Sequence, residues 1–412
     1  MMKNLTCLRN KRICVASEHH DRLGTIAASS GKPINYRFAR CRREREIVWF
    51  MLISLTVLGY ATEHNDTAQD SARSIKSQVA NFNMITADRN ADRQKLVAGY
   101  EAALRVYNEK KFPLKWARIQ VDLGNAYVDL SSGNRNDNLQ KASIAYEAAL
   151  RVYTEKRYPI QWATTRNNCG NVYANLKLGG RQQNQQQAIN AYQASLRIFT
   201  ERDFPIDWAA TQNNLGNVYL QLRNDVCYQN LQMAIAAYEA ALRVYTEKNF
   251  PTIWAKAQYN LGNAYSKFPL GNSQENLHKA RTAYQTALRV YNESDFPVDW
   301  AKIQKSLGTV FLQLPRDRRQ ENLQAAIAAY ESALRVYSEK NYPLEWAEIE
   351  NNLGLAYKNF SIADRRENLL NAIFCFKNAL KIWTPHAYPK YHQIAGNNLQ
   401  KTQKLLQNLA KK

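Results

Sequence analysis

The amino-acid sequence predicts an all-α solenoid built from antiparallel helix pairs. Three observations lead to this fold class. Proline, tryptophan and tyrosine each recur every 46 residues, no insertion or deletion interrupts this period from about residue 90 onward, and apolar residues within each unit recur at helical spacing. A fixed period of this length is typical of a repeat array, in which each unit buries its apolar face against its neighbours. The recurring prolines are Pro113, Pro159, Pro205, Pro251, Pro297, Pro343 and Pro389.

The unit from Pro205 to Lys248 shows how each pair of helices is predicted. Its opening proline suits the first turn of a helix, where the missing N–H costs nothing, and Trp208 and Tyr219 follow on one apolar stripe. Polar residues then break the pattern, and a second helix carries Tyr238 at its centre. Pro251 begins the next unit, because proline cannot continue a helix.

The predicted array covers residues 90–412 and begins and ends within a unit. Arg93–Glu109 reads as a second-type helix without a complete first helix before it. At the other end, His392 replaces the recurring tryptophan and Gln400 the recurring glycine, so the final first-type helix is degenerate. We expect this helix and the Gln/Lys-rich tail to cap the array.

Residues 1–89 do not share the repeat. Residues 1–46 are a basic segment, expected to be disordered or to result from a mis-assigned start, with translation beginning near Met51 or Met84. Residues 47–61 are an apolar run, shorter than the ~20 residues of a spanning helix but long enough for a signal peptide or short anchor. Residues 62–89 read as a linker. The expected location is cytoplasmic, and the alternative is export or membrane anchoring through residues 47–61.

The net charge restricts the possible partners only slightly. The chain has 56 Lys+Arg and 35 Asp+Glu, a formal charge of +21, and residues 1–90 account for +6 of it. The remaining +15 on the repeats attracts acidic peptides, nucleic acid or anionic lipid alike. Six cysteines without a CxxC pair suit a reducing compartment.

The repeat resembles the tetratricopeptide repeat (TPR). Residues 213–219, NNLGNVY, look like the first helix of that family, whose pattern is W-x2-L-G-x2-Y, and residues 234–242 look like its second helix. The 46-residue unit is similar to the long repeats of kinesin light chains and of cyanobacterial proteins that carry a caspase-like protease. The resemblance implies a right-handed superhelical α-solenoid that binds peptides or proteins in a concave groove.

A row of asparagines is the main candidate for the binding groove. On a helical wheel, Asn213 and Asn217 lie one turn apart, on the side away from the apolar stripe. An amide offers donors and an acceptor, which suits the backbone of an extended peptide. The resemblance implies a ligand contact for one asparagine of each first helix, because carboxylate-clamp members of the family bind their ligand through asparagine at the position of Asn125, Asn171, Asn217 and Asn263. The alternative is that the amides bond only to each other or cap a neighbouring helix. The candidate asparagines are Asn125, Asn167, Asn171, Asn213, Asn217 and Asn263.

Three lysines share the same predicted face, namely Lys256, Lys302 and Lys305, while Glu348 reverses the charge one unit later. A basic face lined with amides favours acidic segments, and the alternative is a merely solvated charged face. The other asparagine of each pair, such as Asn168 or Asn214, lies beside the stripe and is predicted to bond between helices.

No set of residues predicts catalysis, a metal site or a cofactor, because no histidine recurs with a cysteine or carboxylate at the required spacing. The recurring tryptophans are predicted to pack in the core. The sequence therefore predicts a non-catalytic scaffold that binds protein or peptide ligands. The alternatives are a basic solenoid that binds nucleic acid, which the absence of exposed groove aromatics disfavours, and a regulatory array for a separately encoded protease-like effector. A membrane is a predicted partner only if residues 47–61 form an anchor.

Overall fold

The computed structural model describes residues 91–222, 227–268, 273–315, 318–362 and 364–410. These residues belong to one compact unit, Ile85–Lys412. The predictions for residues 1–46, 47–61 and 62–89 lie outside the described residues. Within the described ranges every regular element is a helix, and none of these helices is both long and apolar enough to cross a membrane.

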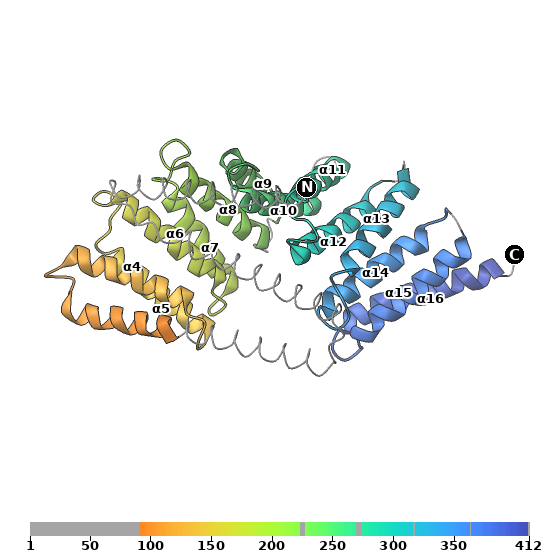
Figure 1. Ribbon diagram of the computed structural model, residues 1–412, viewed down its shortest axis with the longest axis horizontal. Coiled ribbons are helices and arrows are strands. Elements are labelled where there is room, and N and C mark those ends of the chain that lie inside the picture. The colour runs from red at the N-terminus through yellow and green to blue at the C-terminus, as the bar shows by residue number, and fades with distance from the viewer. Residues whose placement is uncertain (1–90, 223–226, 269–272, 316–317, 363, 411–412) are drawn as a thin grey trace, which may run out of the picture. The chain divides into compact units, whose positions relative to one another are not determined.

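The helices follow one another in pairs, as predicted (Figure 1). A helix over residues 91–106 comes first. The pairs are then α4 (Pro113–Asp129) with α5 (Arg135–Ala149), α6 (Pro159–Asn175) with α7 (Arg181–Ser195), α8 (Pro205–Gln221) with α9 (Cys227–Val244), α10 (Pro251–Lys267) with α11 (Ser273–Ala287), α12 (Pro297–Gln313) with α13 (Arg319–Leu334), and α14 (Pro343–Asn359) with α15 (Arg365–Ile382), before α16 (Pro389–Ala410). This arrangement confirms the all-α, TPR-like solenoid.

Proline sets the start of every first helix. α4, α6, α8, α10, α12 and α14 all have proline in their first turn, after an aromatic residue outside the helical region. Phe204, for example, has φ −135° and ψ 57°, as expected for a residue that precedes proline. The aromatic–proline pair therefore marks the turn between units.

Packing runs along the array in two ways. Each first helix packs against the second helix of its own unit, and each second helix packs against the next first helix. Neighbouring first helices also contact each other from α6 to α16, whereas no two second helices pack to that extent in the described part of the chain. The first helices therefore form one continuous face, and the second helices cover its back.

A glycine in each first helix admits the tyrosine of its partner. A Cβ built on Gly170 would lie 2.5 Å from a ring carbon of Tyr192, and one on Gly216 would lie 2.8 Å from Tyr238. Such distances are too short for any other residue at these positions. Gly124, Gly262, Gly308 and Gly354 make the same contact with Tyr146, Tyr284, Tyr330 and Phe376.

The recurring tryptophans are buried, which confirms their predicted place in the core. Trp208 is 8% exposed, and the Arg243 guanidinium carbon lies 5.0 Å from the centre of its ring. Arg243 also pairs with Glu201 at 2.8 Å, which lowers the pKa of that carboxyl. The same combination recurs from Trp116 with Arg151 and Glu109 to Trp346 with Lys381 and Glu339. Because the glutamate belongs to the preceding unit, each of these three-residue groups joins a unit to the one before it.

A buried asparagine closes the loop between the helices of a unit. Asn184 is 6% exposed and donates from Nδ2 to the backbone oxygens of Leu176, at 3.1 Å, and Leu178, at 2.7 Å. Asn138 and Asn368 make the corresponding bonds in their units. This asparagine recurs with the same 46-residue period as the proline and the tryptophan.

Candidate functional site

The candidate site is the face formed by the first helices. Four of the predicted asparagines, one from each of α4, α6, α8 and α10, are half-buried there. Each side-chain oxygen accepts a hydrogen bond from the tyrosine hydroxyl of the same unit. The bonds join Tyr146 to Asn125 at 2.6 Å, Tyr192 to Asn171 at 2.8 Å, Tyr238 to Asn217 at 2.9 Å, and Tyr284 to Asn263 at 2.8 Å.

Three of these oxygens, those of Asn125, Asn171 and Asn217, accept a second bond from the next unit. Asn214 donates from Nδ2 to Asn171 at 3.0 Å, and Asn260 donates to Asn217 at 2.9 Å. Asn168 reaches Asn125 at 3.5 Å. The prediction that Asn168 and Asn214 bond between helices is therefore confirmed.

The helical wheel placed Asn217 away from the packed stripe, but its side-chain oxygen faces the second helix of the unit, where Tyr238 donates to it. The adjacent glycine lets the Tyr238 ring lie flat across α8, so that the hydroxyl emerges beside Asn217. The Nδ2 atoms differ from the oxygens, because within the described residues no hydrogen bond occupies those of Asn125, Asn171, Asn217 or Asn263. Each amide is thus bound inward through oxygen and keeps free N–H donors.

Two later units, in which another residue replaces the asparagine, indicate the structural role of its side-chain oxygen. In α12 the position holds Thr309, whose hydroxyl lies 3.1 Å from that of Tyr330. In α14 it holds Leu355, and the partner in α15 is Phe376, which has no hydroxyl. Beside the glycine, a hydrogen-bonding side chain therefore accompanies each tyrosine hydroxyl from α4 to α12, and leucine accompanies the phenylalanine that lacks a hydroxyl. This covariation, over a separation of 21 residues, is a signal in the sequence that the predictions above did not use.

Asn167 and Asn213 occupy a different position on the same helices. The Asn167 oxygen accepts from the Thr211 hydroxyl at 3.2 Å. The Asn213 oxygen is buried without a partner, because Ala257 stands where the preceding unit has Thr211. Both residues are half-buried between neighbouring first helices.

The three predicted lysines do not form one cluster of equivalent charges. Lys305 pairs with Glu348 at 2.8 Å, so its charge is compensated. Lys256 and Lys302 are exposed and line a hollow of about 50 Å³ with Tyr259. The Lys302 ammonium lies 5.1 Å from the centre of the Tyr259 ring. Of the three lysines, the two without a carboxylate partner among the described residues therefore lie between α10 and α12, with Asp299 also on the wall of the hollow.

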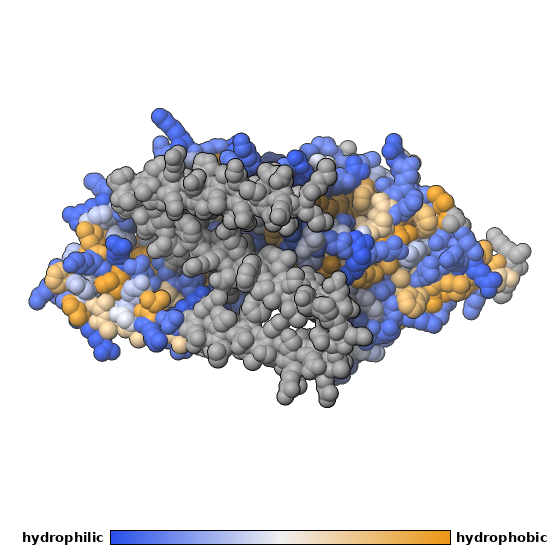
Figure 2. Space-filling view, in the orientation of Figure 1, coloured by the Kyte–Doolittle hydropathy of each residue, from blue (hydrophilic) through white to orange (hydrophobic). Residues whose placement is uncertain are grey.

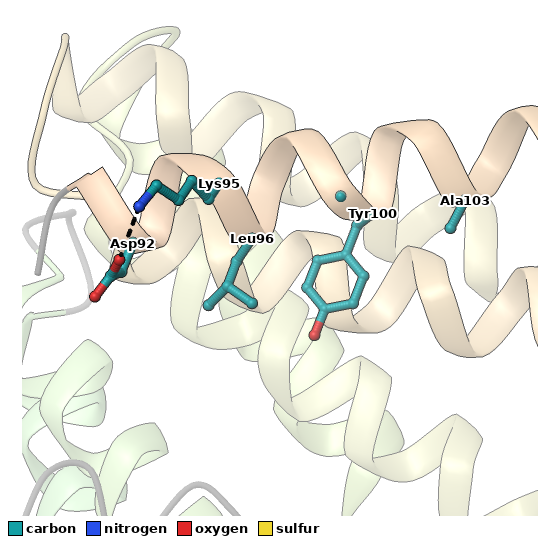
Figure 3. Close-up of a pocket in the computed structure, with 6 residues that line it drawn as sticks. Asp92, Lys95, Leu96, Tyr100 and Ala103 are labelled. Atoms are coloured by element: carbon teal, nitrogen blue, oxygen red, sulfur yellow. Dashed lines mark hydrogen bonds and ion pairs between the residues drawn. The ribbon is translucent and has the colours of Figure 1, made fainter.

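A larger hollow lies on the 91–106 helix (Figure 3). It has a volume of about 610 Å³ and is lined by Leu96, Gly99, Tyr100 and Ala103, with Asp92 and Lys95 at one end, where they form an ion pair at 3.4 Å. Tyr100 stands one repeat before Tyr146, so the hollow lies on the surface that packs against a first helix in the later units. We therefore interpret it as a packing surface of the repeat and not as a ligand site.

No group of three or more metal-ligating side chains occurs among the described residues. Cys169 and Cys375 are buried, and burial raises the pKa of both thiols, which keeps them protonated and unreactive. Cys169 occupies the core position that Leu215 and Leu261 hold in the following units.

No family model and no curated protein matches the sequence. Among solved structures, the chain is similar to a chain of the APC/C hetero-tetramer Cut9–Hcn1, with 16% identity, a TM-score of 0.44, and coverage of 75% of this chain and 46% of that one. It is also similar to yeast Tom70, with 14% identity, a TM-score of 0.35, and coverage of 76% and 60%. The chain therefore spans less than two thirds of either, and neither similarity is close enough to transfer a function.

Proposed function

We propose that the protein is a non-catalytic interaction scaffold that binds extended peptide segments along the face of its first helices. The observation that carries the proposal is the row of free Nδ2 donors on Asn125, Asn171, Asn217 and Asn263. These donors repeat once per unit, and the helices that carry the last three of them contact each other. An extended peptide presents carbonyl oxygens that such donors bind.

The bonds to the amide oxygens support this proposal. An asparagine whose oxygen accepts two hydrogen bonds cannot rotate freely, so its N–H groups hold one direction. Binding then requires little further loss of side-chain entropy, which is the advantage of a preorganised site. The structural and the ligand-binding interpretations of the asparagines are therefore compatible.

The charges favour acidic segments. Lys256 and Lys302 are exposed and form no ion pair with any residue that the structure describes, and they lie at equivalent positions of neighbouring first helices. A ligand carboxylate between them would replace its bound water with charge-assisted hydrogen bonds to both ammonium groups. Lys305 contributes less to the proposed site, because Glu348 already compensates its charge.

Replacing Asn171 and Asn217 by threonine tests the proposal. Threonine keeps an acceptor for the tyrosine, as Thr309 does for Tyr330, but removes the free amide donor. We expect the melting temperature to change little. The affinity for short acidic peptides, measured by fluorescence anisotropy, should fall by ~0.5–1.5 kcal/mol for each bond lost. The matched control is Asn190→Thr on α7, an exposed asparagine on a second helix, which should leave binding unchanged.

Two results would contradict the proposal. One is unchanged peptide affinity in the double variant, which would leave the asparagines with a structural role alone. The other is tight binding of single-stranded nucleic acid that weakens by roughly 10³–10⁵ between 50 and 200 mM salt, because six to ten phosphate contacts produce that dependence.

A further inference from the structure

The outer surface of α15 exposes two large apolar side chains, one helical turn apart. Leu370 is 47% exposed and Phe374 is 64% exposed. Both point away from the core that Leu369, Cys375 and Phe376 enter. The fold does not require them, because the packing of α15 against α14 and α16 uses the opposite side of the helix.

The other units show which residues these exposed positions hold when only folding is required. At the position of Leu370 every other second helix has a polar residue, and at the position of Phe374 only one has a large apolar residue. The first set is Gln94, Gln140, Gln186, Gln232, His278 and Gln324, and the second is Ala98, Ile144, Asn190, Ala236, Thr282 and Ala328. Among the second helices, α15 alone has a large apolar residue at both of these positions.

A third position on the same face changes with them. Lys377 stands where other second helices carry glutamate or glutamine. In several units that glutamate accepts a bond from a tyrosine of the next first helix, as Glu239 does from Tyr265 and Glu331 from Tyr357. α16 has Gln403 in place of this tyrosine. Residue 377 therefore needs no acceptor for a tyrosine hydroxyl, and Lys377 is exposed.

Positive charge surrounds the two apolar residues. Arg366 lies one turn before Leu370, Lys377 lies about one turn after Phe374, and both are exposed. α15 and α16 together contain seven lysines and arginines and one acidic residue, Glu367. Figure 2 shows apolar and hydrophilic residues side by side on the surface of these C-terminal helices.

We propose that Arg366, Leu370, Phe374 and Lys377 form a second docking surface, which binds an acidic amphipathic helix of a partner protein. The four residues lie about one turn apart, so the strip is as narrow as the contact between two helices. Leucine and phenylalanine supply apolar area at its centre. The basic residues at its two ends select a partner with glutamate or aspartate beside its apolar stripe.

This surface is separate from the asparagine face. It lies on a second helix, whereas the candidate peptide site lies on first helices that the second helices cover from behind. The inference does not depend on the proposed function, and the chain would accommodate both ligands at once.

The test uses the full chain and two helical probe peptides, each with leucine on one side and either glutamate or lysine on the other. We expect the glutamate peptide to bind and the lysine peptide not to bind, in isothermal titration calorimetry. The double variant Leu370→Gln/Phe374→Ala should bind the glutamate peptide at least about tenfold more weakly, since the substitutions remove most of the apolar area that the peptide would bury. These substitutions introduce residues that other units carry at the same positions, so the fold should be retained, as circular dichroism would verify.

The matched control is Ile144→Ala on α5, which removes an apolar side chain that is 63% exposed and should not affect binding. Arg366→Gln with Lys377→Gln should reduce the affinity and its salt dependence together. Equal binding of both peptides, or no binding, would overturn the proposal. So would a concentration-dependent dimer in sedimentation that the Leu370/Phe374 variant abolishes, since the occupant would then be a second copy. Tighter binding to phosphatidylserine–phosphatidylcholine vesicles than to the peptide would point to a membrane instead.

Discussion

The units around α8 and around α14 solve the same packing problem with different chemistry. In the first, Gly216 admits Tyr238, and Asn217 binds the tyrosine hydroxyl. In the second, Gly354 admits Phe376, and Leu355 takes the place of the asparagine. The difference teaches that the amide oxygen serves the hydroxyl opposite it. What remains free for a ligand is the amide nitrogen.

The unit of α14 and α15 also places a carboxyl group where its neighbours have none. Glu350 is 6% exposed and accepts a bond from the Asn378 amide at 3.2 Å, and its second oxygen is buried without a partner. The equivalent residues in α8, α10 and α12 are Gln212, Gln258 and Gln304. This unit has thus lost a polar pair at the first-helix face and gained a buried acid between its helices.

Gly170→Ala should have the largest effect, because the glycine–ring contact is common to both kinds of unit. The new methyl group would lie 2.5 Å from the Tyr192 ring, and overpacking of this kind costs ~1–3 kcal/mol or more. Chemical denaturation measures the loss. The control is Gly396→Ala in α16, where nothing lies within 4 Å of the added carbon. There the variant should gain up to ~1 kcal/mol from helix propensity. Equal effects at the two sites would contradict the packing account.

The second prediction converts one kind of unit into the other. Phe376→Tyr alone should destabilise the protein by ~1–3 kcal/mol, because it leaves a buried hydroxyl unpaired beside Leu355. Leu355→Asn alone should cost less, because residue 355 is only half-buried. The double variant should recover ~0.5–1.5 kcal/mol through the new hydroxyl–amide bond. A double-mutant cycle of unfolding free energies measures this coupling. Purely additive losses would show that the asparagine and tyrosine do not act as a pair.

The sequence was sufficient to predict the fold because each signal was local or periodic. The period gave the array, proline gave the helix starts, and Trp208 was assigned to the core from its place on the apolar stripe. The role of Asn217 was harder to predict because a helical wheel considers one helix at a time, and its partner Tyr238 lies on another. The exposed pair on α15 required knowledge of which face of α15 is covered.

The last and smallest effect concerns the buried acid. Desolvation raises the pKa of Glu350, while hydrogen bonds from Cys375 and Asn378 and the charge of Lys381 partly oppose this shift, and Glu339 adds to it. The folded state therefore favours the protonated carboxyl more than the unfolded state does. The free energy of unfolding should decrease as pH rises from the ordinary carboxyl range through the raised value, and the full cost is present above it.

Glu350→Gln places there the residue of the neighbouring units and removes this dependence. The variant should match the parent at acid pH and be more stable at neutral pH. The control is Glu348→Gln, two residues away and exposed, which loses only its pair with Lys305 and should be slightly destabilising at neutral pH. Unfolding titrations from acid to neutral pH compare the three proteins. A Glu350→Gln variant that is less stable at neutral pH would mean that the ionised carboxylate supports the unit, and that its bond to Asn378 outweighs desolvation.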